Sequence, residues 1–183
     1  MAGSRPIVTE PRTDVILSEM SGAFRYYLST ETGMREFQKA RRLMEVAFVL
    51  QTAQCATGPE LAHLRRTLQE NEAALDDEER FVDTDVAFHF PSVQVSQSKL
   101  MSELHRAVFV WLRTQPSMSI KPAGSSHVAF KAHQLIFDAI VARDPQAAEA
   151  AMVRHLEDVE RYYWGAAAGH GVQPLTQIQK QAT

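Results

Sequence analysis

Three stretches of this chain repeat apolar residues at a helical spacing, and each carries a histidine on its apolar face. These histidines are His89, His133 and His155. In the first stretch Asp85 precedes His89 by one helical turn, so both side chains lie on one face, roughly 40° apart. Each polar residue stands where a core residue would otherwise be, so the three helices must pack with these side chains inside. The sequence therefore predicts a helical bundle with a polar centre.

Helical periodicity and capping residues divide most of the chain into helices. The predicted helices cover about residues 15–29, 30–56, 57–75, 76–90, 96–114, 125–143 and 144–164. Ser125 or Ser126 is expected to cap the sixth of these helices. Pro91 is expected to kink or end the fourth, because proline lacks a backbone donor and clashes with the preceding turn. The predicted fold class is all-α, an antiparallel bundle of six or seven helices with a central metal site.

Length and charge narrow the class of protein. With 183 residues the chain is long enough for one domain with a hydrophobic core. Its net charge of -3 argues against a nucleic-acid-binding surface on these residues. The single cysteine, Cys55, excludes an internal disulfide and fits a reducing compartment, and the sequence has no long apolar run. A cytoplasmic location is therefore expected.

The polar residues at the predicted centre have the chemistry of metal ligands. A buried aspartate is costly unless it is paired or binds a cation. Three imidazoles and one carboxylate suit zinc, nickel or another first-row divalent ion, and an ion that prefers more ligands keeps open positions for water or an organic acid. The alternative is a hydrogen-bonded polar core without an ion. The remaining histidines are expected at the surface or the rim: His63, His105, His127 and His170.

Several motifs, taken in order, resemble a known family. They are Ala40-Arg41-Arg42-Leu43-Met44-Glu45, Asp85-x3-His89, His133-Gln-Leu-Ile-Phe-Asp-Ala-Ile140 and Asp144-x3-Ala148-x3-Met152-x2-His155-Leu156. Together they resemble the C-terminal effector domain, or FCD domain, of the FadR subfamily of GntR-type transcriptional regulators. The likeness is greatest to the sialic-acid-responsive members. It implies an FCD domain over residues 13–164, followed by a flexible tail over residues 165–183.

The resemblance implies a metal site and an effector cavity. Asp85, His89, His133 and His155 match the metal ligands of the family, with zinc as the expected ion and nickel or another first-row ion as alternatives. Arg41 matches an arginine that faces the cavity and can pair with a carboxylate. The implied effector is a small organic acid: a sugar acid, a hydroxy acid or a dicarboxylate. Family members usually act as homodimers.

Three further features of the sequence can be compared with the pattern of the family. Residues 1–12 resemble the last strand and linker of a winged helix-turn-helix, so DNA would be contacted through an N-terminal winged-helix domain that this chain lacks. Ser98 stands where the family often has asparagine. Phe90-Pro91-Ser92 interrupts a helix that continues in the family.

The function that these expectations imply is ligand sensing in a bacterial transcriptional regulator, without enzymatic activity. The alternative is a metalloenzyme that uses the same aspartate and three histidines to hold an ion that activates water or oxygen. Glu45 and Glu103 are the only nearby candidates for its general base. A third interpretation is a structural dimerisation module with a satisfied polar core and no ion.

Overall fold

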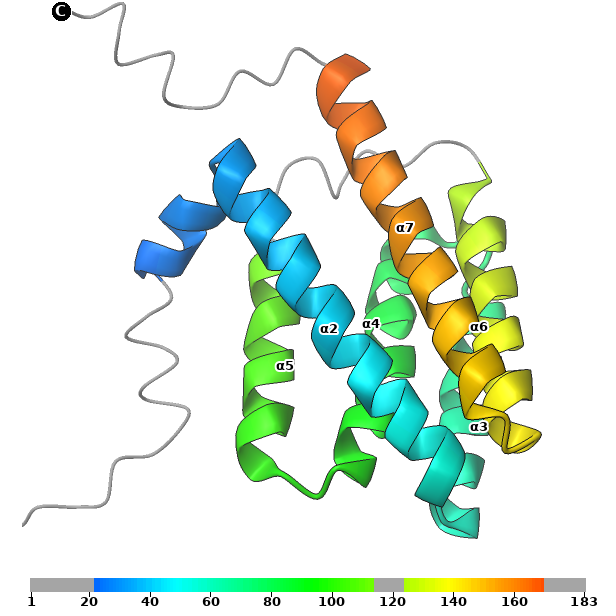
Figure 1. Cartoon of the computed structure of the whole chain (residues 1–183). Helices are drawn as coiled ribbons and strands as arrows, with labels where there is room; N and C mark the ends of the chain where they lie inside the picture. The colour runs from blue at the N-terminus through cyan, green and yellow to red at the C-terminus, as the bar shows by residue number, and fades with distance from the viewer. Residues whose placement is uncertain (1–21, 114–123, 170–183) are drawn as a thin grey trace, which may run out of the picture.

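The computed structural model describes residues 22–113 and 124–169, and every regular element in these ranges is a helix (Figure 1). Residues 22–28 are helical, and six longer helices follow. They are α2 (Glu31–Cys55), α3 (Gly58–Glu72), α4 (Glu78–Val95), α5 (Lys99–Arg113), α6 (Ser125–Val141) and α7 (Pro145–Gly169). The prediction of an all-α bundle is confirmed. The predicted winged-helix remnant at residues 1–12 lies outside the described residues, as does most of the predicted tail, although α7 continues past its expected end near Trp164.

Five helices, α2, α3, α4, α6 and α7, contribute buried side chains to the largest apolar cluster of the described residues. α7 packs against α2 and α6, and α4 packs against α2, α3, α5 and α6 (Figure 1). The members of this cluster include Val49 of α2, Leu64 of α3, Phe88 of α4, Ile140 of α6 and Met152 of α7, all almost fully buried. Within the described ranges, no helix is both long and apolar enough to span a membrane.

Helix ends follow local side-chain chemistry in most places. Thr30 and Asp77 cap α2 and α4 by accepting backbone N–H bonds from Gly33 and Arg80. The sixth helix differs from the prediction, because its N-cap is Gly124 in the left-handed region (φ 81°), with no side-chain cap. Glycine adopts this conformation without steric cost, so Ser125 becomes the first helical residue instead of the cap.

Pro91 does not end its helix, so of the two predicted outcomes, a kink or an end of α4, the end is wrong. α4 continues through Pro91 to Val95. Proline inside a helix costs about 3 kcal/mol. The turn after Pro91 is buried, however, and Val93 is fully inaccessible to solvent, so packing of this turn offsets the lost hydrogen bond. The continuation holds the second half of α4 against α2, where Thr52 donates to the carbonyl of Ser92 at 3.4 Å.

The start of α3 gives a stability prediction. The side chain of Glu60 accepts bonds from the Thr57 backbone N–H (2.7 Å) and hydroxyl (2.8 Å), and Thr57 caps the backbone N–H of Glu60. Replacing Thr57 with alanine should lower the free energy of unfolding at neutral pH by about 1 kcal/mol. Thr32→Ala, an exposed change in the first turn of α2, is the matched control and should have little effect.

In acid, the Thr57→Ala replacement should lower the free energy of unfolding by a smaller amount. The bonds from the backbone and side chain of Thr57 hold the pKa of Glu60 below its usual value. A lowered folded-state pKa stabilises the protein above the unfolded-state pKa, and this contribution is lost as the pH falls through the folded value. Urea titrations of both proteins at neutral pH and near pH 3 test this. An equal loss of stability at the two pH values would contradict the role of the Glu60 carboxylate.

Candidate metal centre

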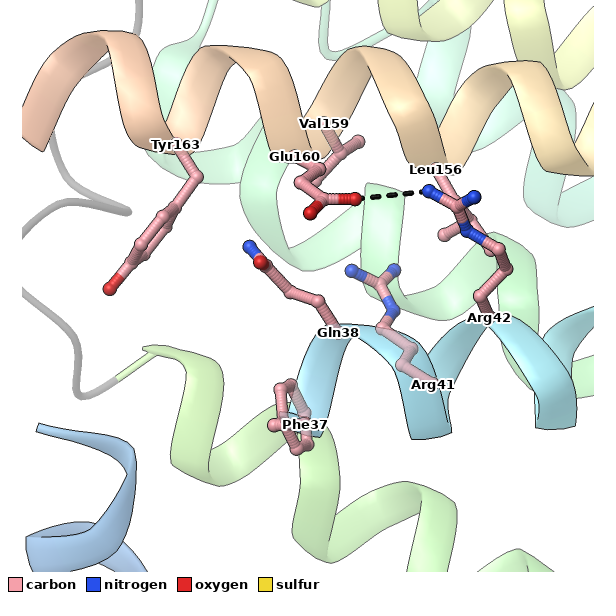
Figure 2. A pocket seen from close by; sticks show the side chains of 8 residues that line it. All are labelled: Phe37, Gln38, Arg41, Arg42, Leu156, Val159, Glu160 and Tyr163. Atoms are coloured by element: carbon pink, nitrogen blue, oxygen red, sulfur yellow. Dashed lines mark hydrogen bonds and ion pairs between the residues drawn. The ribbon is translucent and has the colours of Figure 1, made fainter. Parts of the chain in front are cut away.

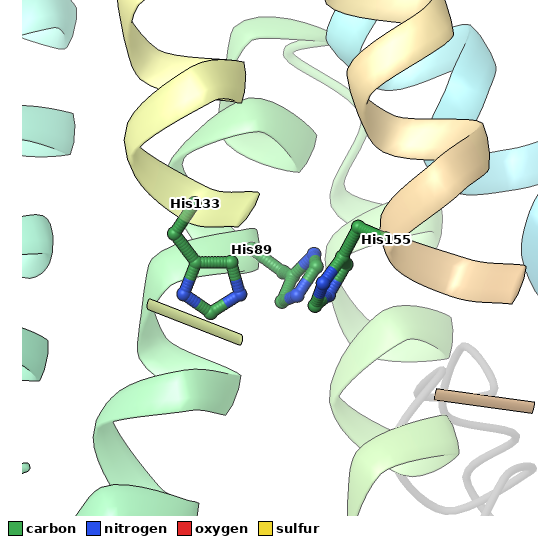
Figure 3. A group of neighbouring side chains, drawn as sticks. All are labelled: His89, His133 and His155. Carbon is green, nitrogen blue, oxygen red and sulfur yellow. The ribbon is translucent and has the colours of Figure 1, made fainter. Parts of the chain in front are cut away.

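Three histidines from three helices meet in the core of the bundle. Figure 3 shows His89 on α4, His133 on α6 and His155 on α7 with their rings close together. The ring centroids of His133 lie 5.3 Å from His89 and 4.7 Å from His155, and each residue is at most 1% exposed. Each residue offers one ring nitrogen to a common site, and these nitrogens lie within 4.8 Å of one another. The structure thus brings together three of the four predicted ligands.

These separations suit a small metal ion. Zinc binds imidazole nitrogen at about 2.0–2.1 Å, so two nitrogens on one ion lie about 3 to 3.4 Å apart. The ligand nitrogens, which lie within 4.8 Å of one another, would have to move closer together to reach that value. A buried histidine nitrogen without a hydrogen bond is costly, yet the Nε2 atoms of His89 and His155 have no hydrogen-bond partner among the described residues. An ion between the rings would satisfy both atoms.

Asp85, the fourth predicted ligand, lies at the edge of this cluster. Its Oδ1 is 3.6 Å from Nε2 of His133, and its side chain is 21% exposed. It is therefore not among the three residues whose ligand atoms converge. The distance is close to that expected between two ligands of one ion, so a small rotation would bring the carboxylate into the coordination sphere.

Asn71 orients His133, and sequence reasoning did not identify this role. The amide oxygen of Asn71 lies 2.9 Å from Nδ1 of His133, and its amide nitrogen donates to Thr84 at 3.1 Å. Because that oxygen can only accept, Nδ1 of His133 carries the proton and Nε2 faces the other ligands. Asn71 is fully buried on the inward face of α3, one turn after Thr67. The spacing of Thr67 and Asn71 by one helical turn was the feature of the sequence that could have indicated an inward-facing Asn71.

Electrostatics keep His155 in the form that binds metal. Burial lowers the pKa of His155 well below its usual value, and the neighbouring charges of His133 and His89 lower it further. A neutral imidazole has a lone pair available for an ion, whereas an imidazolium does not. His155 is therefore ready to bind an ion at neutral pH.

Arg41, the predicted effector contact, lines a pocket to which none of the three histidines contributes. Its side chain is 7% exposed, and its Nε forms no hydrogen bond among the described residues but lies 3.7 Å from Oε1 of Glu45. The pocket lies between α2 and α7, and Figure 2 shows the Arg41 guanidinium directed toward α7. Its lining residues are Phe37, Gln38, Arg41, Arg42, Leu156, Val159, Glu160 and Tyr163. The neighbour Arg42 is already paired with Glu160 at 3.0 Å.

The two acids that a metalloenzyme could use as a base lie in different places. Glu45 is 1% exposed and contacts Nδ1 of His89 at 3.3 Å. Its other oxygen lies 3.2 Å from Nε2 of His105. Glu103 pairs with Arg106 on the outer side of α5. His105 is only 3% exposed, so the prediction that it lies at the surface or rim is wrong.

Comparison with known proteins shows the family of this chain. The FCD domain matches residues 36–158. The HTH-type transcriptional repressor NanR of Klebsiella aerogenes is 33% identical over 159 residues, which are 86% of this chain and 61% of that protein. NanR of Salmonella newport is 32% identical over the same shares of both chains. The chain belongs to the FCD-domain family, and it spans about three fifths of the length of these curated relatives.

Solved structures share the fold. Escherichia coli McbR/YncC is similar with a TM-score of 0.64 and 17% identity, covering 74% of this chain and 66% of that chain. Streptococcus agalactiae GntR has a TM-score of 0.61 at 22% identity, covering 72% of this chain and 61% of the other. The metal-free FCD domain of TM0439 has a TM-score of 0.60 at 18% identity, covering 74% of this chain and 94% of that domain.

Proposed function

We propose that this chain is the effector-sensing domain of a bacterial GntR-type transcriptional regulator. The observation that carries the proposal is the buried cluster of His89, His133 and His155, whose ligand nitrogens lie within 4.8 Å of one another. Asp85 would complete the ligand set, with zinc as the first candidate ion and nickel or another first-row ion as alternatives. The family membership and the repressor relatives support a regulatory role.

The effector would be a small carboxylate held between the ion and Arg41. The burial of Arg41 and its contact with Phe109, whose ring centroid lies 4.9 Å from the guanidinium carbon, keep this cation in a sparsely hydrated place. In such surroundings a guanidinium binds a carboxylate more strongly than it would in water. Sugar acids, hydroxy acids and dicarboxylates all carry the required group. Polar side chains of the pocket, such as Gln38, would contact hydroxyl groups of a larger acid.

Effector binding would change the relative position of α2 and α7, which both line the pocket. DNA would be contacted by other parts of a complete regulator, and the sensing domain would act on them by shifting the balance between two arrangements. We also propose that two copies of the chain pair. Exposed apolar side chains such as Leu43, which is 76% exposed, support this pairing. We expect no turnover of the bound acid.

A thermal-shift screen tests the proposal. Sialate, lactate and succinate represent the three classes of acid, and each is added to zinc-loaded protein and to protein kept in chelator. At about a hundredfold excess over its Kd, a bound acid should stabilise the fold by about 2.7 kcal/mol. We expect this stabilisation only with metal present. Equal shifts with and without chelator would contradict binding at the ion.

Arg41 provides a direct prediction for the effector. Arg41→Gln should weaken binding of the acid found in the screen by about tenfold to a hundredfold, because a charge-assisted hydrogen bond is lost. Arg66→Gln, an exposed change on α3, is the control. Calorimetric titration of the three proteins provides the measurement. Unchanged affinity in Arg41→Gln would remove Arg41 from the effector site.

A further inference from the structure

Glu45 is a buried acid on α2 that the proposed ligand set does not include. Its side chain is 1% exposed and contacts three groups that can carry positive charge. Oε2 lies 3.3 Å from Nδ1 of His89, while Oε1 lies 3.2 Å from Nε2 of His105 and 3.7 Å from Nε of Arg41. An ionised carboxylate is tolerated in the core only when such partners surround it. Each of its oxygens faces a different imidazole.

The position of Glu45 determines which nitrogen of His89 faces the other two histidines. A carboxylate beside Nδ1 stabilises a proton on that atom, which leaves the lone pair on Nε2. Both ring nitrogens of His89 are buried without a hydrogen bond among the described residues, as is Oε2 of Glu45, so the preference for a proton on Nδ1 rests on the 3.3 Å approach of the carboxylate. In metal sites, a carboxylate on the outer nitrogen of a ligating histidine sets the orientation of the ring and raises its basicity.

His105 holds the Glu45 carboxylate from the opposite side. It lies on α5, and its ring packs against Phe109 with centroids 4.5 Å apart. Because His105 and Arg41 both approach Oε1, the other oxygen remains directed at His89. The contacts form a chain from His105 through Glu45 to His89, and they join α5, α2 and α4.

We propose that Glu45 is a positioning residue for the metal centre. It holds His89 as the tautomer protonated at Nδ1 and directs Nε2 at the ion, and His105 fixes the carboxylate in this place. His133 receives the same orientation from a neutral group, the amide of Asn71. The inference rests on the metal centre in the proposed function.

Two measurements on the full chain test this role. The first is competition for zinc with a chromophoric chelator, in which Glu45→Gln should bind zinc about tenfold or more weakly than the wild type. Glu157→Gln, an exposed acid on α7, is the matched control and should bind as the wild type does. The second is the ¹⁵N NMR spectrum of the histidines in metal-free protein. We expect His89 protonated at Nδ1 in the wild type, and both tautomers in Glu45→Gln.

The outcomes separate the two proposals. A wild-type chain that binds no zinc would overturn the metal centre, and the role of Glu45 with it. If the wild type binds zinc but Glu45→Gln binds it equally well, only the role of Glu45 is wrong. The NMR measurement on the wild type does not depend on whether the variant folds. Finding His89 protonated at Nε2 there would overturn the inference by itself.

Discussion

Replacing His133 and His155 together with alanine should reduce bound zinc from about one ion per chain to a level that elemental analysis does not detect. A structural or catalytic site holds its ion with three or four protein ligands, so the loss of two leaves too few. Both rings are almost fully buried, and the double variant would keep only His89 and Asp85 of the four proposed ligands.

His127→Ala is the matched control for this experiment. His127 lies on α6 like His133, but its side chain is exposed and outside the cluster. This variant should retain zinc at the wild-type ratio. Equal zinc in the double variant and the wild type would show that the ion, if present, is bound elsewhere.

Replacing Phe88 with alanine should strongly destabilise the fold. Phe88 is 1% exposed in the largest core cluster, and its ring stacks on His133 with centroids 4.2 Å apart. Truncation of a buried phenylalanine costs about 3–5 kcal/mol. In a chain of this length, each kcal/mol lowers Tm by about 2–4 °C. Calorimetric melting of metal-free protein measures the loss without a contribution from the ion.

Phe88→Leu separates packing from stacking. Leucine keeps most of the buried volume, so its cost should be clearly smaller than that of alanine. It lacks a ring to hold the imidazole of His133, so zinc affinity should still fall. Val128→Ala, a partly exposed change on α6, should leave Tm nearly unchanged. A loss below about 1 kcal/mol in Phe88→Ala would contradict the placement of this ring in the core.

Periodicity predicted the centre of this fold because helices have one buried face. His133 and His155 lie on the apolar faces of α6 and α7. Because these faces must be buried, it was predictable that the two histidines would point into the core. The predicted helix end at Pro91 was wrong because a local preference was given more weight than the burial of the residues that follow it. The packing of buried residues such as Val93 outweighs the unfavourable effect of a proline inside the helix.

The residues that orient the ligands could not be predicted in the same way. Periodicity allows Asn71 and Glu45 to face inward, whereas His105 was predicted at the surface or rim, and periodicity identifies a partner for none of the three. Those partners lie on other helices, far away in the chain: Asn71 contacts His133, and Glu45 contacts His105. Such pairs depend on how the helices cross and rotate, which only the three-dimensional structure specifies.

The visible absorption spectrum of the cobalt-substituted protein tests sensing at the histidine centre most directly. Cobalt takes imidazole and carboxylate ligands as zinc does, and its bands change with the number and geometry of ligands. We predict bands of a site with nitrogen ligands, and a change in them when the acid that raised Tm enters an open coordination position. A spectrum without such bands, or one that this acid leaves unchanged, would contradict the proposal that the ion binds the effector.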